Sequence, residues 1–394
     1  MELIEKVKYK KTEVGLIPED WDVKPIGQYA KLINGRAYAI HEWETQGIPV
    51  IRLQNLTGNG ENYYYSNLKL PEKQYCNFGD LLFMWSATFG AVIWKGEKAI
   101  YHYHIWKIEA DTKKLNKWFL FHVLIELTER VKKSSTNGGT MLHVTKKSMD
   151  ETFIPLPTLS EQTAIATALS DADALISSLE KLIEKKRDIK TGAMQKLLTP
   201  KKGWESKKLG EFGECIIGLT YSPDNVKESG KLVLRSSNVQ GSILKYDNNV
   251  FVDSFIPEKL LVKKNDILIC VRNGSRDLIG KCALIEGKAI GETFGAFMSV
   301  YRSPYNEFVF NVFQSNIIKK QIDEHLGATI NQITNKSLNS FEIPFPPVEE
   351  QIKIVNILSD MNSEIVTLES KLDKYKMLKQ GMMQNLLTGK IRLV

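Results

Sequence analysis

The sequence of 394 residues contains a long internal repeat. Residues 154–199 align without a gap with residues 343–388, and 20 of the 46 aligned positions are identical. Shorter stretches upstream of each copy are also similar: 138–153 with 327–342, 21–35 with 204–218, and 48–60 with 231–243. The chain is therefore expected to be organised as A–B–A′–B′, in which the two B segments are alike and the two A segments differ.

The repeat predicts four segments and a fold class. The segments are 1–153, 154–199, 200–342 and 343–394. Both A segments alternate short β-rich runs with Gly, Asn and Asp turns, and helical patterns come late in each, at 115–133 and 305–327. We expect an α+β fold with two globular domains of mixed, mainly antiparallel β-sheet with helices, separated by two long helices that form an antiparallel coiled coil with pseudo-two-fold internal symmetry.

Each B segment carries an apolar seam at heptad spacing, which predicts one long helix. Proline-containing stretches, IPLPTLSEQ and IPFPPVEEQ, precede the seams and favour a helix start. A helix of about 40 residues is on the order of 60 Å long and cannot bury its own seam, so the two helices are expected to pack on each other. An antiparallel pair would place the A segments at opposite ends. The predicted packing residues are Leu169, Ile176, Leu179, Ile183, Leu197, Leu358, Ile365, Leu368, Leu372 and Leu386.

Two lysines occupy equivalent seam positions, and two glycines lie inside the predicted helices near their ends. Lys190 and Lys379 could extend past the seam to solvent, or they could fix the register and orientation of the helix pair. Gly192 and Gly381 each cost a helix roughly 1 kcal/mol relative to Ala. They indicate a close helix approach, a partner contact, or simple inheritance from a duplication.

Composition limits the class of protein. Apolar runs such as 80–94 are too short to span a membrane, and the N-terminal residues lack the apolar core of a signal peptide, so a soluble cytoplasmic protein is expected. The four cysteines form no CxxC pair and are expected to be core residues. A net charge of +7 permits nucleic-acid binding without requiring it.

Motifs for catalysis and metal binding are incomplete. Residues 274–282 resemble a phosphate-binding loop but have one residue too many and Cys in place of Ser or Thr. The chain has neither a cofactor-binding glycine motif nor the catalytic tetrad of a DNA methyltransferase. The acidic stretch DWDVK at 20–24 is a weak nuclease signal, and His102 and His104 have no further ligand nearby in the sequence. A protein without catalytic residues and without a metal is expected.

Several motifs together resemble one known family. The pattern IPLP or IPFP, EQ, a long helix and GxMQxLLT occurs twice and ends in TGKIRL at 388–393, and GDLLFMWSATFGA and NDILICVRNGS accompany it. This resembles the specificity subunit of Type I restriction-modification enzymes over essentially the whole chain. The resemblance implies two target recognition domains that each read one half of a bipartite sequence in double-stranded DNA, and helices that set the gap and dock two modification subunits.

The resemblance also implies where the chemistry lies. No cofactor is expected on this subunit. S-adenosylmethionine, ATP and magnesium are expected on the modification subunits and on the restriction subunits, which translocate and cleave DNA.

Candidate DNA contacts follow from side-chain chemistry, since Arg matches guanine, Asn or Gln matches adenine, and Lys, Ser or Thr often bind phosphate. In the first A segment they are Arg52, Gln54, Asn55, Trp85, Ser86, Thr88, Thr140, His143, Lys146 and Lys147. In the second they are Arg235, Ser237, Asn238, Arg272, Asn273, Ser275, Arg276, Thr329, Gln332, Asn335 and Lys336. The ordinary alternative is solvated surface, or core in the case of Trp85.

Two functions from other classes remain as alternatives. A self-contained nuclease would cleave DNA with magnesium and without other subunits. A coiled-coil adaptor would bind proteins and not DNA, and it would lack binding that weakens steeply with salt.

Overall fold

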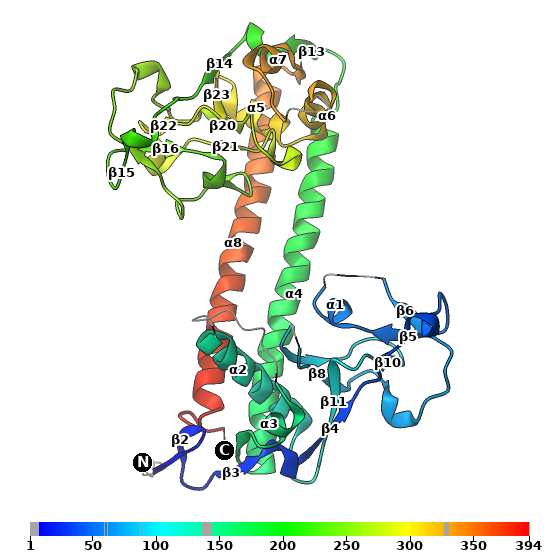
Figure 1. The fold of residues 1–394 in the computed structure, drawn as a ribbon. Helices are drawn as coiled ribbons and strands as arrows, with labels where there is room; N and C mark the ends of the chain where they lie inside the picture. The colour runs from blue at the N-terminus through cyan, green and yellow to red at the C-terminus, as the bar shows by residue number, and fades with distance from the viewer. Residues whose placement is uncertain are drawn as a thin grey trace. The chain divides into compact units, whose positions relative to one another are not determined.

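The computed structural model describes residues 8–58, 60, 62–86, 88–135, 144–326 and 331–393. The chain forms two compact units, which comprise residues 1–180 with 370–394, and residues 181–369. The two long helices, α4 (Leu159–Leu197) and α8 (Val348–Leu386), each contribute a stretch to both units, so every unit holds a sheet domain and part of each helix (Figure 1).

The first unit contains two four-stranded sheets. Its strands are β1 (Tyr9–Thr12), β2 (Gly15–Pro18), β3 (Asp22–Pro25), β4 (Ala30–Asn34), β5 (Ile48–Ile51), β6 (Tyr64–Ser66), β7 (Tyr75–Cys76), β8 (Leu81–Met84), β9 (Gly90–Ile93), β10 (Ala99–Tyr101), β11 (Ile105–Ala110) and β12 (Phe153–Leu156). Its shorter helices are η1 (Ile26–Gln28), η2 (Ile40–Glu42), α1 (Leu53–Leu56), η3 (Glu72–Gln74), α2 (Lys117–Ser135) and α3 (Lys146–Asp150).

One sheet of the first unit has the order β4-β11-β8-β9 and is antiparallel throughout, and the other has the order β6-β5-β10-β7 with β5 and β10 parallel. Strands β3 and β12 pair where the chain enters and leaves the domain, and β1 and β2 form an N-terminal hairpin. Strand β8 is buried along its whole length because both faces are covered, with α2 beside the neighbouring strand β9.

The second unit repeats this plan. Its strands are β13 (Glu205–Lys208), β14 (Glu214–Ile217), β15 (Val226–Lys227), β16 (Lys231–Leu234), β17 (Val239–Gln240), β18 (Ile243–Leu244), β19 (Phe251–Val252), β20 (Ile267–Cys270), β21 (Cys282–Leu284), β22 (Thr293–Phe294), β23 (Met298–Arg302) and β24 (Glu342–Phe345). Its shorter helices are η4 (Leu209–Glu211), η5 (Pro223–Asn225), η6 (Ser236–Asn238), η7 (Glu258–Leu260), η8 (Arg276–Leu278), η9 (Gly287–Ala289), α5 (Asn306–Phe313), α6 (Asn316–His325) and α7 (Asn335–Ser340).

The antiparallel sheet of the second unit matches that of the first, whereas the other sheet, β15-β19-β16-β22, gains β15 beside β19 and has no strand in the place of β7. The sheet β14-β23-β20-β21 is antiparallel, the parallel pair β16 and β22 stands where β5 and β10 stand, and β13 pairs with β24 as β3 pairs with β12. The prediction of two α+β domains with mainly antiparallel sheets, and of two long paired helices, is confirmed. The helical pattern at 305–327 forms two helices, α5 and α6, because the Ser315 hydroxyl accepts a hydrogen bond from the Ile317 amide and starts a new helix.

The long helices begin at their proline-containing stretches. In α4 the side-chain amide Nε2 of Gln162 donates to the carbonyl oxygens of Pro157 and Lys114. In α8 the side-chain Nε2 of Gln351 donates to the Pro346 carbonyl. Both glutamines are buried. The first seam position of each repeat thus fixes the turn before its helix.

Most of the predicted packing residues are buried, and some of them belong to domain cores: Leu169 and Leu386 to the core of the first unit and Leu358 to that of the second. The predicted packing residues that are buried are Leu169, Ile176, Leu179, Ile183, Leu358, Ile365 and Leu386, and those that are half-buried are Leu197, Leu368 and Leu372. Met194 in the last turn of α4 and Leu198 directly after the helix are buried and pack into the core of the second unit. The buried face therefore shifts where α4 leaves the helix pair for the sheet domain.

The seam lysines contact the opposite helix. Lys190 Nζ donates to Asn362 Oδ1 at 2.8 Å, and Lys379 Nζ lies 2.5 Å from Asp173 Oδ1. Positions 173 and 362 are equivalent in the repeat, as are 190 and 379, because each pair differs by 189. Lys379 is mostly buried, with 16% of its side chain exposed. These contacts favour a role in register and orientation over extension into solvent.

A second set of ion pairs follows the same symmetry. Arg187 pairs with Glu369, and Lys376 pairs with Glu180 at 2.8 Å. Adding 189 to 187 gives 376, and subtracting 189 from 369 gives 180, so one pair maps onto the other. This pair therefore recurs in both units, whereas the Lys186–Glu364 pair of the second unit does not, because Tyr375 and Leu175 stand at the equivalent positions.

The helix glycines do not serve close packing within the described chain. A Cβ atom built at Gly192 or Gly381 would meet no atom within 4 Å. Of the predicted alternatives, a partner contact and inheritance from a duplication are the ones compatible with this open space.

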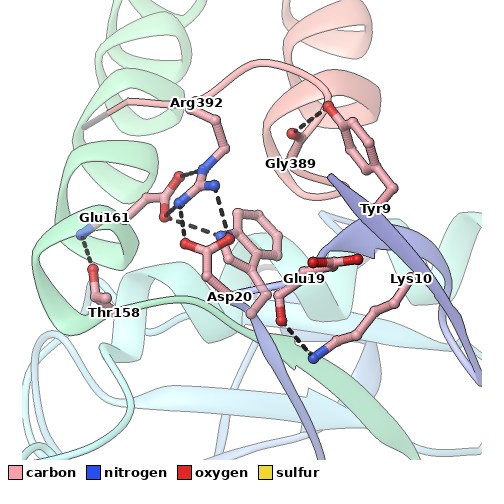
Figure 2. Close-up of polar contacts among 9 residues, drawn as sticks. Tyr9, Lys10, Glu19, Asp20, Thr158, Glu161, Gly389 and Arg392 are labelled. Atoms are coloured by element: carbon pink, nitrogen blue, oxygen red, sulfur yellow. Dashed lines mark hydrogen bonds and ion pairs between the residues drawn. The ribbon is translucent and has the colours of Figure 1, made fainter. Parts of the chain in front are cut away.

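An ion-pair cluster joins the two ends of the chain in the first unit (Figure 2). The Arg392 guanidinium contacts Asp20 at 2.8 and 3.0 Å and Glu161 at 2.5 and 2.8 Å. Trp21 Nε1 donates to the same Glu161 carboxylate at 3.0 Å. Glu161 is 1% exposed, so its charge depends on Arg392 for neutralisation. The hairpin β1-β2 adds a hydrogen bond from the Tyr9 hydroxyl to the Gly389 carbonyl, 3.3 Å.

The second unit has a related but more exposed cluster. Glu350, which is equivalent to Glu161, accepts from Trp204 Nε1 at 2.7 Å and pairs with Lys201 at 2.6 Å. Both partners follow the end of α4 within one continuous segment. In the first unit the corresponding residues, Trp21 and Arg392, come from opposite ends of the chain.

None of the helices in the described part of the chain is long and apolar enough to cross a membrane.

Candidate nucleic-acid interface

Four segments of the first unit meet at one end of its sheets. They are the turn after β5, the loop after β8, the loop between β10 and β11, and the segment before α3. Trp85 N donates to the His104 carbonyl, Val144 N donates to the Trp85 carbonyl, and His102 N donates to the Ile51 carbonyl. The predicted residues around Arg52, Trp85 and Lys146 therefore belong to neighbouring segments.

Aromatic side chains dominate this surface in the first unit. The Arg52 guanidinium lies 5.9 Å from the Trp43 ring and 5.2 Å from the Tyr64 ring. Trp85 Nε1 donates to the Tyr103 carbonyl at 2.9 Å, and 39% of Tyr103 is exposed. Flat aromatic faces next to an arginine suit stacking and groove contacts with nucleic acid.

His102 is neutral at neutral pH. Burial, together with the neighbouring His104 and Arg52, lowers its pKa to about 4. His102 and His104 lie close, with ring centroids 5.3 Å apart. Among the described residues no group of three or more His, Cys, Asp or Glu side chains is placed to hold a metal ion.

The remaining candidates of the first unit fall into three groups. Thr88, Lys146 and Lys147 are exposed, and Gln54 and Ser86 are half-buried. Asn55 is used within its own turn: its Oδ1 accepts from Arg52 N at 2.9 Å and its Nδ2 donates to the carbonyls of residues 60 and 62. We assign it to turn formation. Thr140 and His143 lie outside the described residues.

An open groove of about 780 Å³ runs beside the edge strand β4 and α3 in the first unit. Its charged lining is mixed, with Lys31, Lys73 and Lys146 beside Asp150 and Glu151. Lys146 is the predicted contact residue that also lines this groove.

The same four segments meet in the second unit. Val271 N and Arg272 N both donate to the Phe297 carbonyl, at 3.0 and 3.1 Å, and Ile333 N donates to the Val271 carbonyl at 2.8 Å. Asn273 Nδ2 donates to Ser236 Oγ at 3.2 Å. Repeat-equivalent backbone contacts, such as Val144 to Trp85 and Ile333 to Val271, show that one frame carries different side chains in the two domains.

Several candidates of the second unit are engaged in structure. Asn238 is 1% exposed and its amide bonds the Lys245 carbonyl, so it shapes the turn as Asn55 does. Asn335 bridges the Cys215 carbonyl and Ser299. Arg235 donates to the Asn248 carbonyl, and Arg276 is directed to Asp323 on α6.

The other candidates of the second unit are at the surface. Ser237, Arg272, Ser275, Gln332 and Lys336 are exposed. Thr329 lies outside the described residues. Phe297, which is 57% exposed, and Tyr103 in the equivalent loop also lie at this surface but are not among the residues predicted from the sequence. An exposed aromatic residue in the tight connection before a buried strand is the signal that could have identified both.

Comparison with known proteins agrees with this architecture. A family model for the Type I restriction modification DNA specificity domain matches residues 18–187 and again residues 201–375. The whole chain is 29% identical to the Type I restriction enzyme MjaVIII specificity subunit of Methanocaldococcus jannaschii, covering 98% of that protein. It is also 29% identical to the putative type I restriction enzyme MjaX specificity subunit of the same organism, covering 99%.

A solved structure shares the fold. The Type-I restriction-modification system S subunit from M. genitalium superimposes with a TM-score of 0.59 at 16% identity, with 98% of both chains covered. The family model matches twice, once for each sheet domain with the helix that follows it. The protein therefore belongs to the family of DNA specificity subunits of Type I restriction-modification systems, in which it is a non-catalytic subunit with two recognition domains.

Proposed function

We propose that residues 1–153 and 200–342 are the target recognition domains and that each reads one half of a bipartite site in double-stranded DNA. The observation that carries this proposal is the repeated frame: the same four segments meet in both domains and present different side chains. Two half-sites of unlike sequence require a shared frame with different surfaces. Contacts to base edges specify the DNA sequence, whereas contacts to the DNA backbone only position the protein.

The proposed contacts are the surface candidates of each frame. In the first domain they are Arg52, Gln54, Trp85, Ser86, Thr88, Lys146 and Lys147, and in the second they are Ser237, Arg272, Ser275, Gln332 and Lys336. Lys146, Lys147 and Lys336 suit phosphate because they are exposed and lie in the first turns of α3 and α7. Thr145 and Thr334 are the N-caps of these two helices.

Residues 154–199 and 343–394 are proposed as the spacer that sets the gap between the half-sites and docks two modification subunits. Exposed apolar side chains on these helices support docking. Ile189 on α4 is 46% exposed and Leu378 on α8 is 54% exposed, and the two positions are equivalent because 189 + 189 = 378. Equivalent apolar positions outside the seam suit two copies of the same partner.

The remaining assignments rest on the family. Modification subunits would bind S-adenosylmethionine and methylate adenine, and restriction subunits would use ATP and magnesium for translocation and cleavage. The cytoplasm, where DNA is accessible to the complex, is the proposed location.

A domain exchange tests the proposal. Residues 200–342 would be replaced by the corresponding segment of a relative, the chimera would be expressed with the modification subunit, and methylated sites would be mapped. The proposal predicts that one half of the recognised sequence changes and the other half persists. A change in both halves would contradict it. Binding by the purified complex should also weaken steeply with salt, whereas a protein-binding adaptor would show no such DNA binding.

A further inference from the structure

Three arginines lie near the recognition frame of the second domain, and two of them contact other residues of the domain through their guanidinium groups. Arg235 donates to the Asn248 carbonyl at 3.1 Å. Arg276 donates to the Asp323 carbonyl at 3.2 Å and faces its carboxylate at 3.8 Å. The Arg272 guanidinium has no hydrogen bond or ion pair with any residue that the structure describes. Among these three arginines, Arg272 is thus the exposed one whose whole guanidinium is available to a ligand.

Arg272 is held in place by its surroundings. Its guanidinium carbon lies 5.0 Å from the centre of the Phe297 ring, and its backbone amide bonds the Phe297 carbonyl. The Phe297 ring is 57% exposed, which is unusual for an aromatic side chain in a tight loop. A cation over an aromatic face loses less rotamer freedom on binding, because the side chain is already restricted.

Gln332 lies beside this pair. Arg272 and Gln332 form an isolated antiparallel β-bridge, so their side chains leave the same face, roughly 5 Å apart at Cβ. The Gln332 side chain is exposed and, within the described residues, makes no hydrogen bond. Arg matches the O6 and N7 acceptors of guanine, and Gln matches N6 and N7 of adenine. Two such side chains about 5 Å apart suit neighbouring base pairs.

We propose that Arg272, oriented by Phe297, reads a guanine in the half-site of the second domain, and that Gln332 reads the adjacent base pair. This inference rests on the proposed function and adds the class of base. The first domain differs at these places, since Ser86 stands at the position of Arg272 and His104 at that of Phe297. Its half-site is therefore read by other contacts, which makes it an internal control.

The test uses the complete complex of this chain with its modification subunit. Methylation would be mapped for the wild type, Arg272→Ala, Arg272→Gln and Phe297→Ala, and the domain exchange would identify the half-site of the second domain. Arg272→Ala should lower methylation of cognate sites roughly 10- to 100-fold and relax discrimination at one G·C pair of that half. Arg272→Gln should move the preference at the same pair towards adenine. Phe297→Ala should act at the same pair with a smaller loss, roughly 2- to 5-fold.

Arg276→Ala is the matched control, because Arg276 is an exposed arginine in the same loop whose guanidinium is directed to Asp323 on α6. It should leave the motif unchanged. The inference would be overturned if the half-site contained no G·C pair, if Arg272→Ala lowered methylation evenly over all sequences, or if Arg276→Ala had the same effect as Arg272→Ala. A continuous wild-type motif would instead contradict the proposed function itself.

Discussion

The cluster around Arg392 gives the sharpest prediction for stability. Substituting Arg392 by Ala removes the cation that faces Glu161 and Asp20 and leaves the Glu161 carboxylate, which is 1% exposed, without a charged partner. Breaking a buried ion pair on one side costs about 3–5 kcal/mol. We expect a loss of about 3 kcal/mol in the free energy of unfolding of the first unit, at the low end of that range, because Asp20 is 58% exposed and water screens it.

Urea unfolding, and hydrogen exchange in β3 and the first turns of α4, would measure this loss. The double variant Arg392→Ala with Glu161→Gln should recover most of it, because Gln removes the unpaired charge and still accepts from Trp21 Nε1. Lys201→Ala is the matched control, since Lys201 holds the equivalent place beside Glu350 but is half exposed. The reasoning would be refuted if Arg392→Ala cost no more than Lys201→Ala, or if Glu161→Gln restored nothing.

The loss should also depend on pH. The Arg392 guanidinium lowers the pKa of Asp20. A carboxyl with a lowered folded-state pKa stabilises the protein above its unfolded pKa, and this contribution is lost as pH falls through the folded value. The difference between wild type and Arg392→Ala should therefore be full at neutral pH and shrink below about pH 4.

Three further changes have expected outcomes. Reversing one charge, Arg187→Glu, should lower the free energy of unfolding by less than about 1 kcal/mol. Adding Glu369→Arg should restore it in a double-mutant cycle, and absence of recovery would contradict the pairing. Burial lowers the pKa of His122 to about 4, so the unfolded state takes up a proton before the folded state does as pH falls below about 6.5. The free energy of unfolding of the wild type should therefore fall by about 2 kcal/mol between pH 7 and 5, and His122→Gln should not show this loss. Parallel pH profiles of the two proteins would refute this. Inserting seven residues at equivalent places in both long helices should change the gap between half-sites in the methylation map and leave both halves unchanged, whereas altered bases with the original gap would be incompatible with a spacer.

The architecture could be predicted because the sequence contains an internal repeat. Heptad seams and proline-containing starts gave both long helices nearly to their ends, and the alternation of β-rich runs with turns gave the sheet domains. The break of 305–327 into α5 and α6 was missed because the apolar pattern continues through Ser315, while a local cap decides where one helix ends and the next begins.

The polar contacts of the helix pair were partly accessible. Lys190 and Lys379 stood out as seam positions, but their partners, Asn362 and Asp173, do not lie on the seam ladder. Applying the repeat offset to a candidate contact would have shown that the two pairs map onto each other. Such a check was possible from the sequence once antiparallel pairing was assumed.

The interface was predicted at the level of loops rather than side chains. Asn55 and Asn238 looked like adenine readers, yet each stands three residues after an arginine whose backbone amide it caps, a local pattern visible in the sequence. Which arginine is available depends on partners distant in sequence, such as Asp323 for Arg276. Likewise, the cluster of Asp20, Glu161 and Arg392 joins residues as far apart as 372 positions, which no periodicity reveals.

The central claim is that this chain carries two separate readers on one spacer. The most direct measurement is to express it with the modification subunit of its own system and to map methylated adenines at base resolution. The account predicts two short defined halves around a fixed gap of undefined sequence. A continuous recognition sequence would contradict it.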